Sequence, residues 1–73
     1  MSVFTEAVLR ELSPEWRSTR EIADSVPVRG VSDNSHMSSV GRTLRKAVRD
    51  GLAEGRAHRD PRGYVWKEWR LRA

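Results

Sequence analysis

Four cationic side chains stand close together within the stretch SSVGRTLRKAVRDGL: Arg42, Arg45, Lys46 and Arg49. Twelve of the fourteen basic residues of this 73-residue chain are arginine, whose planar fork of N–H donors pairs bidentately with a phosphate or a guanine edge. Residues 38–73 hold ten basic and four acidic side chains, whereas residues 1–26 hold three and five. One side or end of the fold should therefore be strongly basic, as is typical of a chain that binds a polyanion.

Other chemistries find little support in the residues. The chain has no cysteine, which excludes disulfides and thiolate metal ligands and favours a cytoplasmic setting. His36 and His58 lack metal-ligand spacing, and no GxSxG, GxxxxGKS or GxGxxG motif occurs. No apolar run approaches the roughly 18 residues of a membrane span, and no signal peptide is expected. We therefore expect no enzyme, no catalytic residue, no cofactor, no metal and no membrane partner.

An apolar side chain every four residues predicts a first helix over about residues 3–12, at Phe4, Val8 and Leu12. Trp16 follows in the stretch SPEWRST. We expect that stretch to be short and extended, and to place the indole on the core.

Ser18 and Glu21 have the spacing of a capping box, in which each side chain bonds an otherwise unpaired N–H at a helix start. This spacing predicts a second helix over about residues 19–25. Proline, glycine, serine and asparagine then interrupt any apolar pattern, so a loop is expected over residues 27–35.

A third helix is predicted over about residues 36–50, with Ser35 as its N-cap and Gly51 in the left-handed position after its end. At about 100° per residue, its apolar side chains share one face: Met37, Val40, Leu44, Ala47 and Val48. The opposite face carries hydroxyls and cations: Ser38, Arg42, Arg45, Lys46 and Arg49.

Residues 52–71 have the pattern of a β-hairpin, because the strand-like runs LAEGRAH and YVWKEWRLR flank the type I turn signal DPRG. Side chains of one parity are expected to face inward: Val65, Trp69 and Leu71. Tyr64 and Trp66 have the other parity and are expected on the exposed side. His58 is interpreted as an ordinary surface residue.

This order of elements resembles the winged helix-turn-helix superfamily of DNA-binding domains. STREIADSV resembles its capped second helix, SSVGRTLRKAVRDGL its recognition helix, and RAHRDPRGYVWKEWRL the two wing strands around a basic tip. The resemblance spans residues 3–72 and implies an α+β fold with three helices and a C-terminal β-hairpin wing, forming one domain over residues 1–73. The connection over residues 27–35 is longer than the tight turn of many members, and offers a further contact through Arg29.

The resemblance implies that the third helix enters a major groove of duplex DNA, while the wing touches phosphates or a neighbouring minor groove. By position, the DNA contacts would be Thr19 and Arg20 on the second helix, Ser38, Ser39, Arg42, Arg45, Lys46 and Arg49 on the third, and Arg59 and Arg62 at the wing tip. Thr43 would join Ser39 in reading base edges. We expect a small transcriptional regulator that binds double-stranded DNA as a homodimer or in a cooperative array. We expect it in the cytoplasm, associated with the nucleoid, or in the nucleus of a eukaryotic host.

Other interpretations remain open. Tyr64 and Trp66 on a charged hairpin suit a protein interface or stacking on a base, so the domain could instead serve as a winged-helix interaction module in a replication, recombination or phage-encoded complex. RNA or unusual DNA forms are alternative ligands. The cationic helix face could also be a solvated surface, and a GC-rich genome alone would raise the arginine content.

Overall fold

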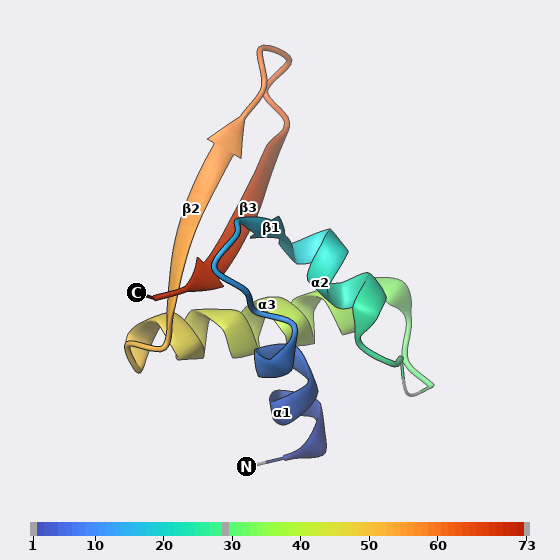
Figure 1. Ribbon diagram of the computed structural model, residues 1–73. Helices are drawn as coiled ribbons and strands as arrows, with labels where there is room; N and C mark the ends of the chain where they lie inside the picture. The colour runs from blue at the N-terminus through green and yellow to red at the C-terminus, as the bar shows by residue number, and fades with distance from the viewer. Residues whose placement is uncertain (1, 29, 73) are drawn as a thin grey trace.

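Three helices and a three-stranded antiparallel sheet make up the computed structural model, which describes residues 2–28 and 30–72 (Figure 1). In chain order the elements are α1 (Val3–Arg10), β1 (Arg17–Ser18), α2 (Thr19–Ser25), α3 (Asp33–Arg49), β2 (Ala53–Arg59) and β3 (Val65–Leu71). The α+β class agrees with the prediction. In the described ranges, no helix has the length and apolar character needed to cross a membrane.

The sheet has the order β1-β3-β2, so that the last strand of the chain is the central one. β1 pairs Arg17 with Trp69, and β2 pairs Gly55 with the same tryptophan. Because β1 is only two residues long, most of the β2–β3 hairpin extends beyond it and away from the helices (Figure 1).

The hairpin closes through the predicted turn. The N–H of Gly63 donates to the carbonyl oxygen of Asp60 at 3.0 Å, the bond that defines a β-turn. The Asp60 carboxylate accepts from the N–H groups of Arg62 and Tyr64, both at 2.9 Å. Asp60 therefore holds the turn together and is committed to backbone donors.

The core lies where α3 passes the base of the sheet, with α1 and α2 packed around it (Figure 1). Every helix and both hairpin strands contribute buried apolar side chains to it: Val8, Leu12, Ile22, Ala23, Val26, Val40, Leu44, Ala47, Ala53 and Trp69.

Trp69 joins the sheet to the helices and is only 4% exposed. Its indole N–H donates to Thr19 Oγ1 at 2.8 Å, which ties β3 to the start of α2. The ring also lies against Gly55, where an added Cβ would stand 2.9 Å from Trp69 Cζ3. Because this is closer than van der Waals contact allows, position 55 suits a residue without a side chain.

The helix boundaries agree with the sequence at α2 and differ at α1 and α3. α2 covers the predicted residues, and both bonds of its capping box are present. α1 ends at Arg10 and not at residue 12. The N–H groups of Glu11 and Leu12 donate to carbonyl oxygens three residues back, and not four, so the last turn is tighter than an α-helix. That tightening precedes Pro14, whose ring disfavours helical geometry before it.

α3 begins three residues earlier than predicted. Ser32, and not Ser35, is the N-cap, and its hydroxyl accepts from the N–H of Ser35 at 3.2 Å. Asp33 in the first turn adds a favourable charge at the positive end of the helix. The expected loop over residues 27–35 is shorter as a result, and Arg29 lies outside the described residues. Gly51 has the predicted left-handed conformation, with φ +79°.

The buried face of α3 includes a polar residue that the apolar pattern missed. His36 is buried, and its Nε2 donates to the carbonyl oxygen of Ala23 at 2.9 Å. Its ring meets Phe4 edge-on. Val48, predicted inward, is exposed because it faces a cleft beside the hairpin.

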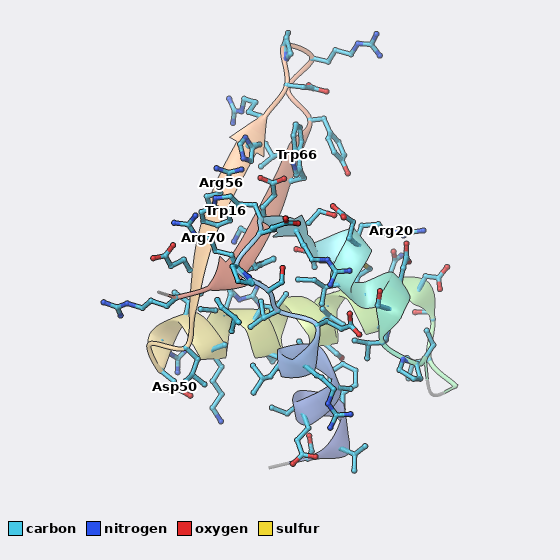
Figure 2. The ribbon with its side chains drawn as sticks, in the orientation of Figure 1. Trp16, Arg20, Asp50, Arg56, Trp66 and Arg70 are labelled. Atoms are coloured by element: carbon cyan, nitrogen blue, oxygen red, sulfur yellow. The ribbon has the colours of Figure 1, made fainter. Side chains whose placement is uncertain are left out.

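Two predictions about the sheet were wrong. Val65 and Leu71 were expected inward, but they are 48% and 40% exposed, because the helices cover only the part of β3 around Trp69. Trp16 was expected on the core, yet it lies on the other face of the sheet beside Arg56 and Arg70 (Figure 2).

The close approach at Gly55 generates a stability prediction. Gly55→Ala should destabilise the fold by about 1–3 kcal/mol, as overpacking does. At a site without strain, the same replacement of glycine by alanine usually raises stability by about 0.4–1 kcal/mol. Chemical denaturation followed by circular dichroism measures the difference. The control is Ala57→Val, at the next position on the same side of β2, where the side chain is exposed and a change within about 0.5 kcal/mol is expected. A gain in stability for Gly55→Ala would contradict the packing account.

Candidate nucleic-acid interface

The outward face of α3 carries four exposed cations: Arg42, Arg45, Lys46 and Arg49. Among residues 2–28 and 30–72, none of the four forms an ion pair with a carboxylate. Their positive charge is therefore uncompensated within this part of the chain. Such a face can bind a polyanion without first displacing an internal partner.

The predicted hydroxyl residues lie on the first half of this face. Ser38 is exposed, while Ser39 and Thr43 are half-buried. Thr43 Oγ1 donates to the carbonyl oxygen of Ser39 at 3.0 Å, which leaves the Thr43 oxygen as an acceptor. Ser38, Ser39 and Arg42 line one shallow hollow together with Asn34 and Ser35, two polar residues that the sequence prediction did not include.

The start of α2 is less free to bind an anion than predicted. Thr19 Oγ1 already accepts from Trp69, and Arg20 lies 3.5 Å from Asp24 in an exposed ion pair. The capping box occupies the N–H groups of Ser18 and Glu21 and brings the Glu21 carboxylate to the helix start. Thr19 and Arg20 nevertheless line the same groove as Ser38, Arg42 and Arg45 of α3.

The two cations of the hairpin tip, Arg59 and Arg62, are exposed. Arg59 ends β2, and Arg62 lies in the turn that joins β2 to β3; Figure 1 shows this turn at the end of the hairpin away from the helices. The structure therefore separates them from the α3 cations, so that the tip can make a contact of its own.

Tyr64 and Trp66 are stacked on one another, with ring centroids 5.9 Å apart. Trp66 also stacks on His58, at 5.4 Å and an interplanar angle of 17°. Trp66 is consequently half-buried and less free than predicted, whereas Tyr64 is 66% exposed. His58 is no ordinary surface residue, since its Nε2 lies 2.7 Å from Glu68 Oε1.

The outer face of the sheet, defined here by Trp16, Glu54, Arg56, Glu68 and Arg70, pairs its charges across strands. Arg56 Nη2 lies 2.8 Å from Glu68 Oε1, and Arg70 Nε lies 2.7 Å from Glu54 Oε2. Trp16 lies between the two arginines, whose guanidinium carbons stand 4.2 and 4.4 Å from its ring centroid (Figure 2). The hydrogen bond from Arg56 lowers the pKa of Glu68, and nearby His58 adds to this effect. The cations of this face are therefore compensated, unlike those of α3.

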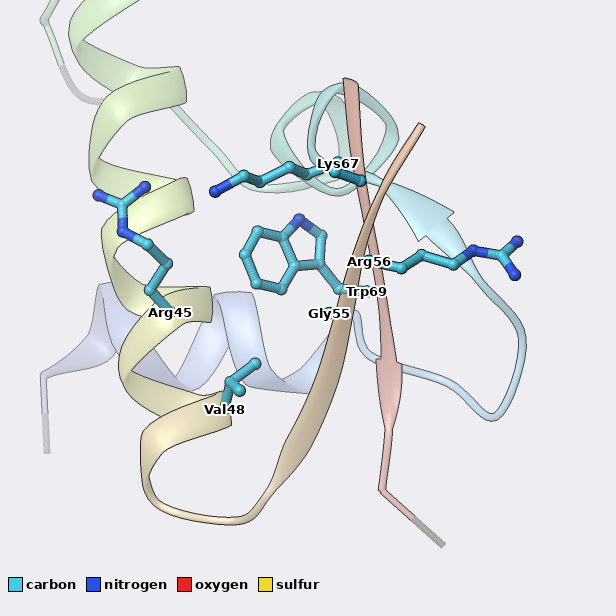
Figure 3. Close-up of a pocket in the computed structure, with 7 residues that line it drawn as sticks. Arg45, Val48, Gly55, Arg56, Lys67 and Trp69 are labelled. Carbon is cyan, nitrogen blue, oxygen red and sulfur yellow. The ribbon is translucent and has the colours of Figure 1, made fainter. Parts of the chain in front are cut away.

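Between α3 and the hairpin lies a cleft that the sequence prediction did not include. It is lined by Arg45 and Val48 from α3, Gly55, Arg56 and Ala57 from β2, and Lys67 and Trp69 from β3. Figure 3 shows Arg45 and Lys67 on one side of the sheet with Trp69, while Arg56 points to the opposite side. Lys67 was not predicted as a site residue, although its parity, shared with Trp69, was a usable signal.

Among the described side chains, no group of three or more histidines and carboxylates is arranged to hold a metal ion. No protein-family model, no curated protein and no solved structure matches the chain.

Proposed function

We propose that the chain is a winged helix-turn-helix protein that binds duplex DNA, with α3 in the major groove and the hairpin on phosphates or an adjacent minor groove. The order of helix, short strand, two helices and hairpin supports this arrangement. So does the pairing of β1 with the central β3, which joins the hairpin to the start of α2. A transcriptional regulator, acting as a homodimer or in a cooperative array, is the role we propose for it.

One observation carries the proposal. The cations of α3 are exposed and without a carboxylate partner in the described residues, whereas Arg56 and Arg70 on the outer face are paired. Phosphate neutralisation by free Lys and Arg releases counterions and supplies most of the affinity of non-specific DNA binding. The contrast between the two faces favours α3 as the side that meets DNA.

Sequence preference would come from the side chains in the groove. Arg42 or Lys46 can donate to the O6 and N7 atoms of guanine, while Ser39 and Thr43 can contact other base edges. Each well-formed bidentate contact would contribute about 1–3 kcal/mol of discrimination.

The first test is duplex binding as a function of salt. A face that neutralises about 5–7 phosphates gives a log-log salt slope of roughly −5 to −6, measurable by fluorescence anisotropy with labelled duplex. Arg42→Ala combined with Lys46→Ala should weaken binding by about tenfold or more. The control is Arg10→Ala combined with Arg72→Ala, which removes the same charge from exposed sites outside α3.

Two results would contradict duplex binding: no salt-sensitive affinity in the unaltered protein, or equal losses in the Arg42/Lys46 variant and in its charge-matched control. Circular dichroism of each variant shows whether the fold is retained.

The second test concerns the hairpin tip. Arg59→Ala combined with Arg62→Ala should weaken binding to all duplex sequences alike and reduce the salt slope by about 2, because phosphate contacts position without reading sequence. The measurement compares a preferred duplex with a scrambled one. A change in their affinity ratio by tenfold would show that the tip reads bases, contrary to this assignment.

A protein-interaction module is the second candidate function, and the exposure of Tyr64 against Trp66 favours it. Aromatic side chains are enriched at protein interfaces. Unlabelled duplex DNA, single-stranded DNA and RNA can each be added in competition with a labelled duplex. Their relative affinities show which nucleic acid the protein binds best. If none of them competes, the interaction module becomes the better proposal.

A further inference from the structure

We propose that the cleft between α3 and the hairpin holds one phosphate group, bound jointly by Arg45 and Lys67. This inference rests on the proposed function in so far as the phosphate belongs to a DNA backbone. A free phosphate ion could bind through the same contacts, and the experiments below distinguish a DNA phosphate from a free one.

The walls of the cleft bring two cations together from distant parts of the chain. Arg45 comes from α3 and Lys67 from β3, and in Figure 3 Lys67 lies above the indole of Trp69 while Arg45 lies beside it. They also line the groove that continues toward the start of α2, and none of the residues lining either hollow is acidic. In the described ranges neither cation forms an ion pair.

The register of the hairpin explains why Lys67 has no partner across the strands. On the outer face, Arg56 stands opposite Glu68 and Arg70 opposite Glu54. On the inner face, Lys67 stands opposite Ala57, which offers no charge. The same two strands therefore compensate their cations on one face and leave a cation free on the other.

The Arg45 side chain has room to lie along α3 because the residue one turn earlier is a glycine. A Cβ built at Gly41 would stand 3.7 Å from Arg45 Nη1, so the guanidinium lies back over that glycine. Gly41 lines the groove together with Arg45 and Lys67. A longer side chain at position 41 would occupy the surface over which the guanidinium now lies.

Arg45 and Lys67 repel one another because both are positively charged. An anion bound between them attracts both side chains and so offsets this repulsion. The floor is formed by Trp69, Val48 and Ala57, whose side chains carry no hydrogen-bond acceptor for the two cations. Phosphate oxygens can accept from the fork of Arg45 and from the ammonium of Lys67 at once. The cleft volume of about 290 Å³ lies at the lower end for ligand pockets, which suits a small anion.

The first experiment compares Arg45→Gln, Lys67→Gln and the double variant in salt-dependent duplex binding. The salt slope changes by about 0.9 for each DNA phosphate that the protein neutralises. If the two cations share one phosphate, the double variant should reduce the magnitude of the slope by about 0.9 and weaken binding about tenfold. Arg10→Gln combined with Arg72→Gln is the charge-matched control and should keep the slope. A loss of about 1.8 would mean two separate phosphates and would overturn the proposal.

The second experiment works without DNA. The indole N–H of Trp69 is followed by ¹⁵N NMR in a variant with Trp16→Phe and Trp66→Phe, which leaves it as the sole tryptophan. Inorganic phosphate, added at constant ionic strength against chloride, should shift this signal saturably, and Lys67→Gln should abolish the shift.

The two readouts together decide the source of the phosphate. A saturable shift in a protein that binds no duplex supports the cleft as a free-phosphate site while the proposed function fails. A slope loss of about 0.9 without a shift supports a backbone phosphate held only within DNA. An unchanged slope with no saturable shift, or a shift that persists in Lys67→Gln, overturns the proposal.

Discussion

The packing of Trp69 against Gly55 is the contact on which the rest of this structure depends. The tryptophan lies at the point where β1, β2 and the start of α2 all meet β3, and its indole bonds Thr19 while its ring occupies the place of a side chain at Gly55. A domain of this size has a small hydrophobic core, and Trp69 is the largest of its buried side chains in the described residues. Trp69 and Gly55 both line the cleft between α3 and the hairpin, so a change in their packing would alter the cleft as well.

Local patterns predicted the elements whose stability is local. The capping box of Ser18 and Glu21 located α2, and the DPRG motif located the hairpin turn, because both depend on neighbours within four residues. Tertiary contacts decided the rest. His36 is buried because the distant carbonyl oxygen of Ala23 satisfies its imidazole, and an apolar periodicity cannot report such a bond.

The candidate site shows the same division. The helical period placed the α3 cations on one outward face, which the structure retains. It could not show which cations are compensated, since Arg56 and Arg70 find their carboxylates only through the strand register. The environment of Trp16 was unpredictable for a similar reason: a two-residue strand carries it to the outer face of the sheet, between arginines far along the chain. The parity of Lys67 placed it on the same face as Trp69, but only the tertiary structure shows that Arg45 of α3 lines the same cleft.

The compensated outer face of the sheet has a consequence for how the molecule approaches a charged surface. With Arg56 and Arg70 paired to carboxylates, α3 and the hairpin tip together carry six exposed cations that form no ion pair within residues 2–28 and 30–72. In the field of a polyanion, an uneven distribution of charge orients a protein before contact, so that productive encounters are more frequent than random collision allows. For a protein that binds duplex DNA, as we propose here, the charge pairing across the outer strands would therefore affect the orientation in which the protein approaches the duplex and the ionic-strength dependence of the association rate.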